Sequence, residues 1–238
     1  MKVRLVSYSQ PDPDYFGSAA VEDGKITSED LIAYCARVSN PGNQDNHSSS
    51  SGLLSYLVKH KHWSPFEMVS ACLEIETTRD IARQILRHRS FSFQEFSQRY
   101  ADPTKELEFV TRETRLQDQK NRQNSIEIEN DPSIQLNATQ QEFIADWRRR
   151  QHGIIKQAQA VYEWAVEQGI AKEQARAVLP EGLVTSRLYM NGTIRSWLHY
   201  IELRSGAETQ KEHREVAIKC GKVLEKVFPS ILKVAKGK

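Results

Sequence analysis

The residues best suited to chemistry in this chain are Arg87-His88-Arg89, followed closely by Ser97, Arg99 and Tyr100. Guanidinium groups carry five donors in a rigid fork that matches the oxygens of phosphates and carboxylates. The hydroxyl groups of Ser97 and Tyr100 add neutral donors within a few residues. These residue types at this spacing indicate a site for a phosphorylated ligand.

The sequence before this cluster predicts that a helix positions it. Thr77-Thr78-Arg79-Asp80 has the pattern of a capping box, which begins a helix. Gln84, Arg87 and His88 are three and four residues apart, so on a helix they project from neighbouring positions. Arg89 would then lie close to the end of that helix.

Two other interpretations of the arginines remain open at this level. A basic helix end is often solvated and paired with nearby acids, of which Glu95 is one. Aromatic residues also interleave with the arginines, as in proteins that bind RNA or single-stranded DNA, at Phe91, Phe93, Phe96 and Tyr100. Composition and spacing alone do not decide between these interpretations and a phosphate site.

Composition narrows the class of protein. A length of 238 residues fits one large domain, and we expect a single catalytic domain over residues 1–238. The net charge of +2 gives no global excess that argues for nucleic acid or a membrane surface. No apolar run approaches the roughly 20 residues of a membrane span. Residues 1–9 alternate as a strand rather than forming a signal peptide, so a cytoplasmic protein is expected.

The cysteines predict neither disulfides nor a metal site. Cys35, Cys72 and Cys220 are far apart, with no CxxC pair. Cys35 and Cys220 fall on apolar helical faces, which favours buried structural thiols.

Periodicity predicts a helix-rich α+β fold with a small antiparallel or mixed sheet. Alternating apolar residues indicate strands at 1–9, 69–75 and 184–190. Apolar residues at helical spacing indicate helices over about 28–38, 53–58, 79–88, 138–168, 193–201 and 211–227. Because strands and helices do not alternate regularly, a doubly wound sheet is disfavoured.

Local signals predict where several elements begin and end. Residues 27–30 and 209–212 have capping-box patterns, and Thr193 can cap the helix that follows it. Asn191-Gly192 is typical of a turn, and Gly169 of a helix C-terminus.

The middle of the chain divides into a polar and an amphipathic part. The segment of about 102–137 is polar, and this composition predicts an irregular or mobile insert with short helices. After it, apolar residues at helical spacing predict a helix over about 138–168, namely Phe143, Trp147, Ile154, Ala158, Val161 and Ala165.

A resemblance to a known family enters through the arginine cluster. Arg-His-Arg, seven residues and then Ser is the signature of flavin-dependent thymidylate synthases, and Arg87-His88-Arg89 followed by Ser97-Gln98-Arg99-Tyr100 is similar to it. The segment His62-Trp63-Ser64-Pro65-Phe66-Glu67 resembles that family's His-x-(Ser/Thr)-Pro-Phe-Glu. Ala36-Arg37-Val38-Ser39 resembles its Ala-Arg-Val-Ser. With Ala175-Arg176 through Pro180 and with Leu203-Arg204, the resemblance covers about residues 30–215.

The resemblance implies a role for individual residues. FAD would be contacted by Ser39, Ser64, Glu67, Arg87, His88, Arg89, Glu95, Thr193, Arg195 and His199. The substrate dUMP would be contacted by Gln84, Arg87, Glu95, Ser97, Gln98, Arg99, Tyr100, Arg176 and Arg204. Arg204 matches the arginine that favours the ionised N3 of uracil, and His62 matches a histidine near the flavin and the pyrimidine. These two are the expected catalytic residues.

The same resemblance implies the reaction and the partners. It implies methylation of dUMP to dTMP, with methylene-tetrahydrofolate as the one-carbon donor and with FAD reduced by NADPH. It implies a homotetramer whose FAD sites are shared between subunits, without a metal, a nucleic acid or a membrane partner. The chain departs from the family's pattern near the FAD adenosine, where Thr193 or Asn191 stands for an Asn, His199 replaces an Asn and Glu208 replaces a His.

Overall fold

The protein combines helices with small antiparallel sheets, in a computed structural model that describes the backbone of residues 1–236 and side chains as far as Lys233. This confirms the prediction of an α+β fold. The chain divides into two compact units. The terminal unit comprises residues 2–75, 88–94 and those from 189 onward, and the middle unit comprises residues 76–87 and 95–188 with Met1.

Three strands contribute residues to both units. They are β2 (Ser70–Thr78), β3 (Ser92–Glu95) and β6 (Thr185–Thr193), which form a sheet with β1 (Lys2–Tyr8) in the order β1-β2-β6-β3. Because these strands belong to both units, the single domain over residues 1–238 stays a prediction.

Backbone hydrogen bonds show that neighbouring strands are antiparallel. In the terminal unit the amide of Ser9 donates to the carbonyl of Ser70, and the amide of Ile194 to that of Val69, each at 2.9 Å. In the middle unit the amide of Arg79 donates to the carbonyl of Val184 at 3.0 Å. The alternation predicted for β2 is confirmed, since Ala71, Leu73, Ile75 and Thr77 are buried and only the last residue, Thr78, is buried out of turn.

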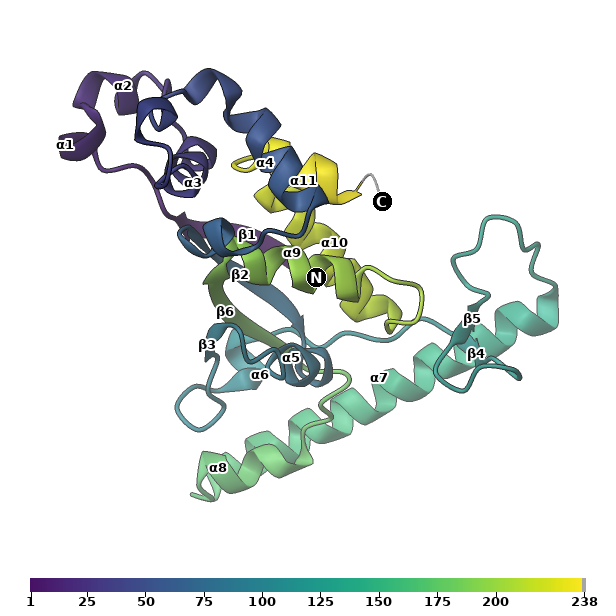
Figure 1. The fold of residues 1–238 in the computed structure, drawn as a ribbon. Coiled ribbons are helices and arrows are strands. Elements are labelled where there is room, and N and C mark those ends of the chain that lie inside the picture. The colour runs from purple at the N-terminus through teal and green to yellow at the C-terminus, as the bar shows by residue number, and fades with distance from the viewer. Residues whose placement is uncertain (237–238) are drawn as a thin grey trace. The chain divides into compact units, whose positions relative to one another are not determined.

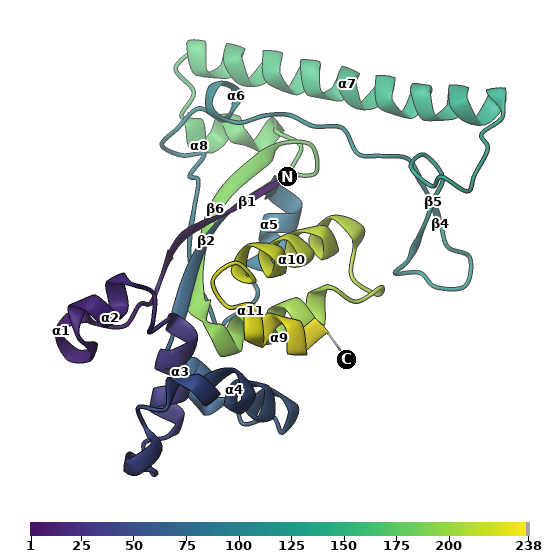
Figure 2. The same cartoon turned by 90° about the horizontal axis from the view of Figure 1, so that it is seen from above.

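The remaining terminal-unit elements are helices and short 3-10 turns (Figure 1). They are α1 (Pro13–Phe16), α2 (Ser18–Glu22), α3 (Ser28–Ala36), η1 (Pro41–Asn43), η2 (His47–Ser49), α4 (Ser50–Lys59), η3 (Ser64–Glu67), α9 (Ile194–Arg204), α10 (Lys211–Leu224) and α11 (Pro229–Lys236). Helix α4 packs against both α3 and α11 (Figure 1), while α10 packs on β1 and α9 packs on α10 (Figure 2). Helix α11 had no counterpart among the predicted elements.

Trp197 anchors α9 in the core of the terminal unit. Its side chain is fully buried, and its indole N–H donates to the carbonyl of Ala71 at 3.0 Å. The ring of Phe91 lies edge-on to it, with ring centroids 4.8 Å apart. Since buried indole groups need a partner for their N–H, this bond fixes how α9 lies along β2.

The middle unit is built on a long helix. Its elements are α5 (Arg79–Ile85), α6 (Pro103–Glu106), β4 (Arg115–Gln117), β5 (Ser125–Glu127), α7 (Ala138–Glu167), α8 (Lys172–Ala175) and η4 (Arg176–Val178). Strands β4 and β5 form an antiparallel hairpin beside the N-terminal part of α7 (Figure 1). The segment of about 102–137 therefore contains a hairpin that was not predicted, together with the short helix α6.

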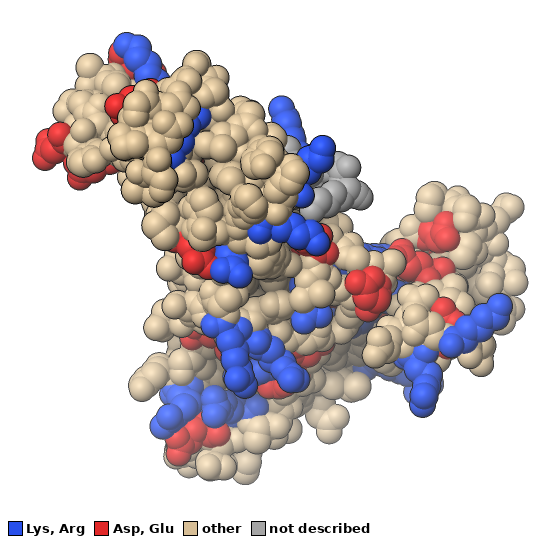
Figure 3. All heavy atoms as spheres, in the orientation of Figure 1, with Lys and Arg blue, Asp and Glu red and all other residues tan. Residues whose placement is uncertain are grey.

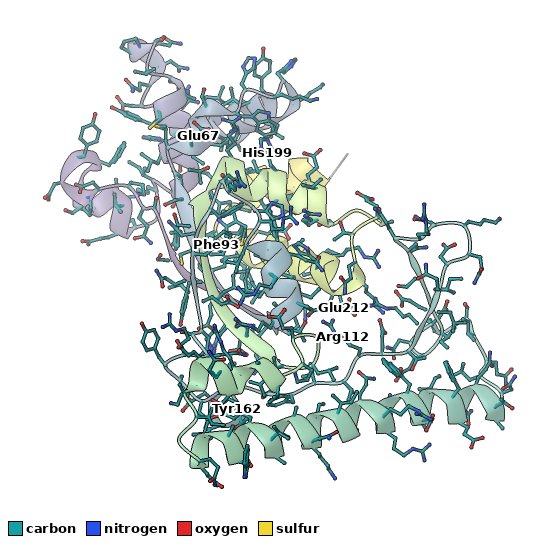
Figure 4. All side chains as sticks on the ribbon, turned by 90° about the horizontal axis from the view of Figure 1, so that it is seen from below. Glu67, Phe93, Arg112, Tyr162, His199 and Glu212 are labelled. Carbon is teal, nitrogen blue, oxygen red and sulfur yellow. The ribbon has the colours of Figure 1, made fainter. Side chains whose placement is uncertain are left out.

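Helix α7 confirms the helix predicted over about 138–168, and it is buried along one face. Its buried residues are Ile144, Gln151, Ile155, Ala158, Tyr162 and Ala165. Tyr162 faces α8, where it packs with Ala175 and Leu179 (Figure 4). Among the apolar residues that indicated this helix, Ala158 and Ala165 are buried, whereas Phe143, Trp147, Ile154 and Val161 are exposed. The helix has two apolar faces, and one chain covers only one of them.

Several predicted element ends were right. Thr27 caps α3 with the reciprocal bonds of a capping box to Asp30. Thr193 caps α9 by accepting from the amide of Ser196, and Gly169 follows α7 with a positive φ of 80°.

Other predicted element ends were wrong, because contacts with distant parts of the chain override the local sequence signals. No side-chain bond caps α5, since Thr78 and Asp80 accept hydrogen bonds from Arg112 instead, at 2.5 and 2.6 Å. Helix α10 begins after Gln210 without a side-chain cap, so residues 209–212 form no capping box. Asn191-Gly192 continues β6 rather than turning, and a side chain at Gly192 would overlap the ring of Phe91.

Candidate functional site

The arginine cluster does not lie on a helix, contrary to the prediction. Helix α5 ends at Ile85, and Arg87, His88 and Arg89 follow it in a tight turn. The amide of Arg87 still donates to the carbonyl of Gln84 at 3.3 Å, and that of Phe91 to the carbonyl of His88 at 3.2 Å. The turn leaves Arg87 and Arg89 exposed and His88 half-buried.

In the terminal unit, His88 holds the guanidinium of Arg204, the last residue of α9. The Nε of Arg204 donates to Nε2 of His88 at 2.9 Å. Burial lowers the pKa of His88, and the charge of Arg204 lowers it further. The imidazole is therefore a neutral acceptor, so Arg204 keeps its full positive charge.

Two further residues surround this pair, and sequence reasoning missed both. The ring of Tyr200 lies edge-on to His88, with centroids 4.9 Å apart, and its hydroxyl lies 3.2 Å from Nε2 of His213. His213 is fully buried, and burial lowers its pKa to about 4, with contributions from Arg204 and His88. Tyr200 is one residue beyond His199 on α9 and faces the core, which its apolar surroundings on the helix could have indicated.

A second group of candidate residues joins η3 to α9 in the terminal unit. Arg195 forms an ion pair with Glu67, and the ring of His199 lies edge-on to Trp63 with centroids 4.8 Å apart. Figure 4 shows Glu67 and His199 at the same end of this unit. Burial and then Arg195 lower the pKa of His199. The structure thus brings together three of the expected FAD contacts.

The other candidates of the terminal unit are more separate. His62 is exposed and lies edge-on to Tyr56, with centroids 6.1 Å apart. Ser39 lines a hollow of about 520 Å³, and Ser64 lines another of about 660 Å³. The hydroxyl of Thr193 is engaged in capping α9, where it accepts a hydrogen bond from the amide of Ser196.

In the middle unit, Glu95 belongs to a network of charges. Its Oε1 accepts from the hydroxyl of Ser186 at 2.7 Å, and its Oε2 accepts from Nη1 of Arg83 at 3.2 Å. The buried guanidinium of Arg79 lies 3.5 Å away and also pairs with Glu181. These contacts hold the carboxylate of Glu95 in place, two residues before Ser97.

Ser97, Gln98 and Arg99 form a compact donor group in the same unit. The amide of Tyr100 closes a turn on the carbonyl of Ser97 at 3.1 Å. Gln98 is only 3% exposed, and its Nε2 finds no hydrogen-bond partner among the described residues. Arg99 pairs with Glu173 at 3.0 Å, while the side chain of Tyr100 is 82% exposed.

The last candidates of the middle unit lie at the ends of two helices. Arg176 begins η4, and its Nε donates to the carbonyl of Glu173 at 3.4 Å. Gln84 is half-buried on α5, one turn before Arg87. The substrate residues are thus grouped mainly in the middle unit and the FAD residues mainly in the terminal unit.

Surface charge does not favour a nucleic-acid interface. Figure 3 shows lysine and arginine interspersed with aspartate and glutamate on the face that it presents, without one continuous basic surface. A basic stripe is the footprint expected of a nucleic-acid-binding protein. Within residues 1–236, no helix has the length and apolar character to cross a membrane. Among the described side chains, no group of three or more His, Cys, Asp or Glu is placed to hold a metal.

Comparison with known proteins gives consistent matches over almost all of the chain. A family described as thymidylate synthase complementing protein matches residues 24–230. The chain is 46% identical over 233 residues to a probable flavin-dependent thymidylate synthase of Paramecium bursaria Chlorella virus 1, with 98% of each chain covered. It is also 46% identical over 232 residues to a flavin-dependent thymidylate synthase of Synechocystis sp., with 97% of each covered. A relative of the same description from Thermosipho melanesiensis is 30% identical over 205 residues, which cover 86% of this chain and 84% of the relative.

Proposed function

Because the chain belongs to the family of flavin-dependent thymidylate synthases, we propose that it methylates dUMP to dTMP. The one-carbon donor is methylene-tetrahydrofolate, and the hydride comes from FAD that NADPH has reduced. The α+β arrangement of the described residues is proposed to be the fold of that family, and residues 1–238 are proposed to form one catalytic domain. The family match over residues 24–230 supports this extent.

The residues proposed to hold FAD fit a ligand that carries phosphates. Arg89 is exposed and has no ion-pair partner within the described part of the chain. Arg195 is paired only with the exposed Glu67, and exposed pairs contribute roughly 0–1 kcal/mol, so a phosphate can replace Glu67 at little cost. When bound, FAD supplies the hydride transfer, and the protein supplies positioning and charge. The full proposed set is Ser39, Ser64, Glu67, Arg87, His88, Arg89, Glu95, Thr193, Arg195 and His199.

The residues proposed to bind dUMP include an unsatisfied donor. A buried donor without an acceptor costs roughly 1–3 kcal/mol, so Nε2 of Gln98 fits an oxygen of a bound ligand. Arg99 can exchange its half-exposed partner Glu173 for a 5′-phosphate. The full proposed set is Gln84, Arg87, Glu95, Ser97, Gln98, Arg99, Tyr100, Arg176 and Arg204.

The bond between Arg204 and His88 carries the mechanistic proposal. A fixed positive charge beside N3 of uracil favours the ionised ring, and the added electron density activates C5. His88 holds the guanidinium at 2.9 Å without neutralising it, since its own pKa is lowered. Arg204 is therefore the proposed catalytic residue, with His62 as a second one near the flavin and the pyrimidine.

We also propose that the protein is a homotetramer with FAD sites shared between subunits. The support is the second apolar face of α7, where Phe143 is 53%, Ile154 50% and Trp164 56% exposed in a single chain. Exposed apolar stripes of this kind mark protein interfaces. Sedimentation tests this directly, and a monomer that still binds FAD tightly contradicts the shared site.

A reducing compartment, the cytoplasm, is the proposed location. The three cysteines are all unpaired, as is usual where thiols are kept reduced.

One assay tests the proposed reaction. Purified protein is incubated with FAD, NADPH, methylene-tetrahydrofolate and dUMP, and dTMP is measured by chromatography. Each component is omitted in turn, and dTMP is expected only in the complete mixture. Oxidation of NADPH without dTMP would indicate a flavin oxidoreductase of another kind. Salt-sensitive RNA binding without a flavin spectrum would indicate a nucleic-acid-binding module.

A further inference from the structure

Arg37, at the C-terminal end of α3, is a buried cation with no ion-pair partner among the described side chains. Only 6% of the residue is exposed, and its Nη2 donates to Oγ of Ser49 at 2.9 Å. Its Nη1 has no hydrogen-bond partner among the described residues, and none of their carboxylates forms an ion pair with it. The carbonyl end of α3 offsets part of this charge. Burial of a guanidinium with a single neutral partner is unfavourable, so an anion bound beside Arg37 would stabilise the folded protein.

Arg37 lines the hollow of about 520 Å³ in the terminal unit. The polar residues around it are all neutral, namely Ser39, Asn40, Asn43 and Ser49. No acidic side chain lines the hollow, so nothing in its wall repels a negative charge. Leu53 and Leu57 form an apolar wall beside these donors.

A second positive contribution comes from helix α4. Ser49, Gly52 and Leu53, around the first turn of this helix, line the hollow. No side chain caps α4, because the hydroxyl of Ser49 donates to the carbonyl of Asn46 at 3.3 Å and accepts from Arg37. The amide of Ser50 already donates to the carbonyl of His47, so this end of α4 contributes the partial positive charge of a helix N-terminus, which favours phosphate.

We propose that this hollow is a phosphate-binding subsite for a nucleotide, with Arg37 as its charged anchor. Its size exceeds that of one phosphate group and fits a phosphate with part of the attached nucleoside against Leu53 and Leu57. On the proposed function, on which this identification rests, the phosphate belongs to FAD or to NADPH. Ser39, expected at the flavin from the resemblance alone, lines the same hollow.

The direct probe is pyrophosphate, measured by thermal unfolding of the whole protein. Ligand that binds only the folded state raises the unfolding temperature. Pyrophosphate, with ionic strength matched by sodium chloride, is expected to raise it for the wild type and for Arg4→Met, an exposed arginine of the same unit. It is expected to leave Arg37→Met unshifted. Without pyrophosphate, Arg37→Met is expected to unfold at or above the wild-type temperature, because the uncompensated charge is gone.

A second variant, Asn43→Asp, tests the subsite independently in case Arg37→Met does not fold. Asn43→Asp keeps the oxygen that accepts from Asn46, at 2.9 Å in the wild type, and adds a negative charge to the hollow. It too is expected to lose the response to pyrophosphate. Flavin fluorescence and NADPH titration then identify the source, since one of the two ligands is expected to bind Arg37→Met about 10-fold or more weaker.

Three results would overturn the subsite. One is an equal pyrophosphate response in all variants, or none in the wild type. Another is unchanged affinity of Arg37→Met for both FAD and NADPH. The third is dissociation of an oligomer by Arg37→Met without any pyrophosphate effect, which would mean that Arg37 pairs with an acidic group of a second copy. The unfolding measurement does not require turnover, so it can succeed even if no dTMP is formed.

Discussion

His213 should make the stability of the protein depend on pH through a single buried side chain. It is fully buried, and its pKa is lowered from 6.5 to about 4 by burial, Arg204 and His88. The folded protein keeps this imidazole neutral at a pH where the unfolded chain takes up a proton. The stability contribution is therefore present above about 6.5 and is lost as the pH falls toward 4.

The size of the effect follows from the shift. One pKa unit corresponds to 1.36 kcal/mol, so His213 lowers the free energy of unfolding by about 2 kcal/mol between pH 7 and pH 5. His213→Gln removes the titration and keeps an amide that can reach the hydroxyl of Tyr200. The variant is expected to lose about 2 kcal/mol less than the wild type over this interval.

Urea unfolding at several pH values measures this difference. His152→Gln, an exposed histidine on α7, serves as the matched control and should follow the wild type. Parallel pH curves for the wild type and His213→Gln would refute the reasoning, because they would mean that His213 titrates alike in both states.

Three other outcomes are expected. Arg204→Ala should reduce dTMP formation far more than FAD retention, and equal loss of both would assign Arg204 to cofactor binding. Replacing all three cysteines by alanine should leave turnover in place, because burial raises the pKa of each thiol and none is an activated thiolate; loss of chemistry in a folded, FAD-loaded variant would contradict this. Gln151→Leu should destabilise the protein by about 2 kcal/mol or more, since the amide of buried Gln151 makes bonds of 2.7 and 3.0 Å to the backbone of Arg112. The control Gln157→Leu, at an exposed position, should leave the free energy of unfolding nearly unchanged in a denaturation experiment. An equal loss of stability in both variants would show that the bonds of Gln151 do not stabilise the protein.

The fold was predictable where local chemistry and packing agree. The alternation of β2 and the capping box at Thr27 depend on neighbouring residues, and both are observed. The capping box expected at Thr77 did not form, because Arg112, far along the chain, donates hydrogen bonds to Thr78 and Asp80. Such a contact leaves no trace in local spacing. The spacing of apolar residues predicted α7 itself but not its buried face, since a helix with two apolar faces does not indicate which one its own chain covers.

The candidate site was predictable in its residues but not in their partners. The signature identified His88 and Arg204, yet their hydrogen bond, the buried Tyr200 and His213 beside it, and the isolated charge of Arg37 came from the structure. A motif specifies residue types in order along the chain. Which side chains lack a countercharge depends on burial and on tertiary neighbours, which the motif does not encode.

The bond between the amide of Arg79 and the carbonyl of Val184 has a consequence for how the chain is made. When β2 leaves the ribosome, β1 is present to pair with it, but β6 follows only after the whole of α7. One edge of β2 is therefore unpaired during most of synthesis, and unpaired edges invite aggregation. Chains that stop before residue 185 should be insoluble for this reason, although they already contain the entire arginine signature.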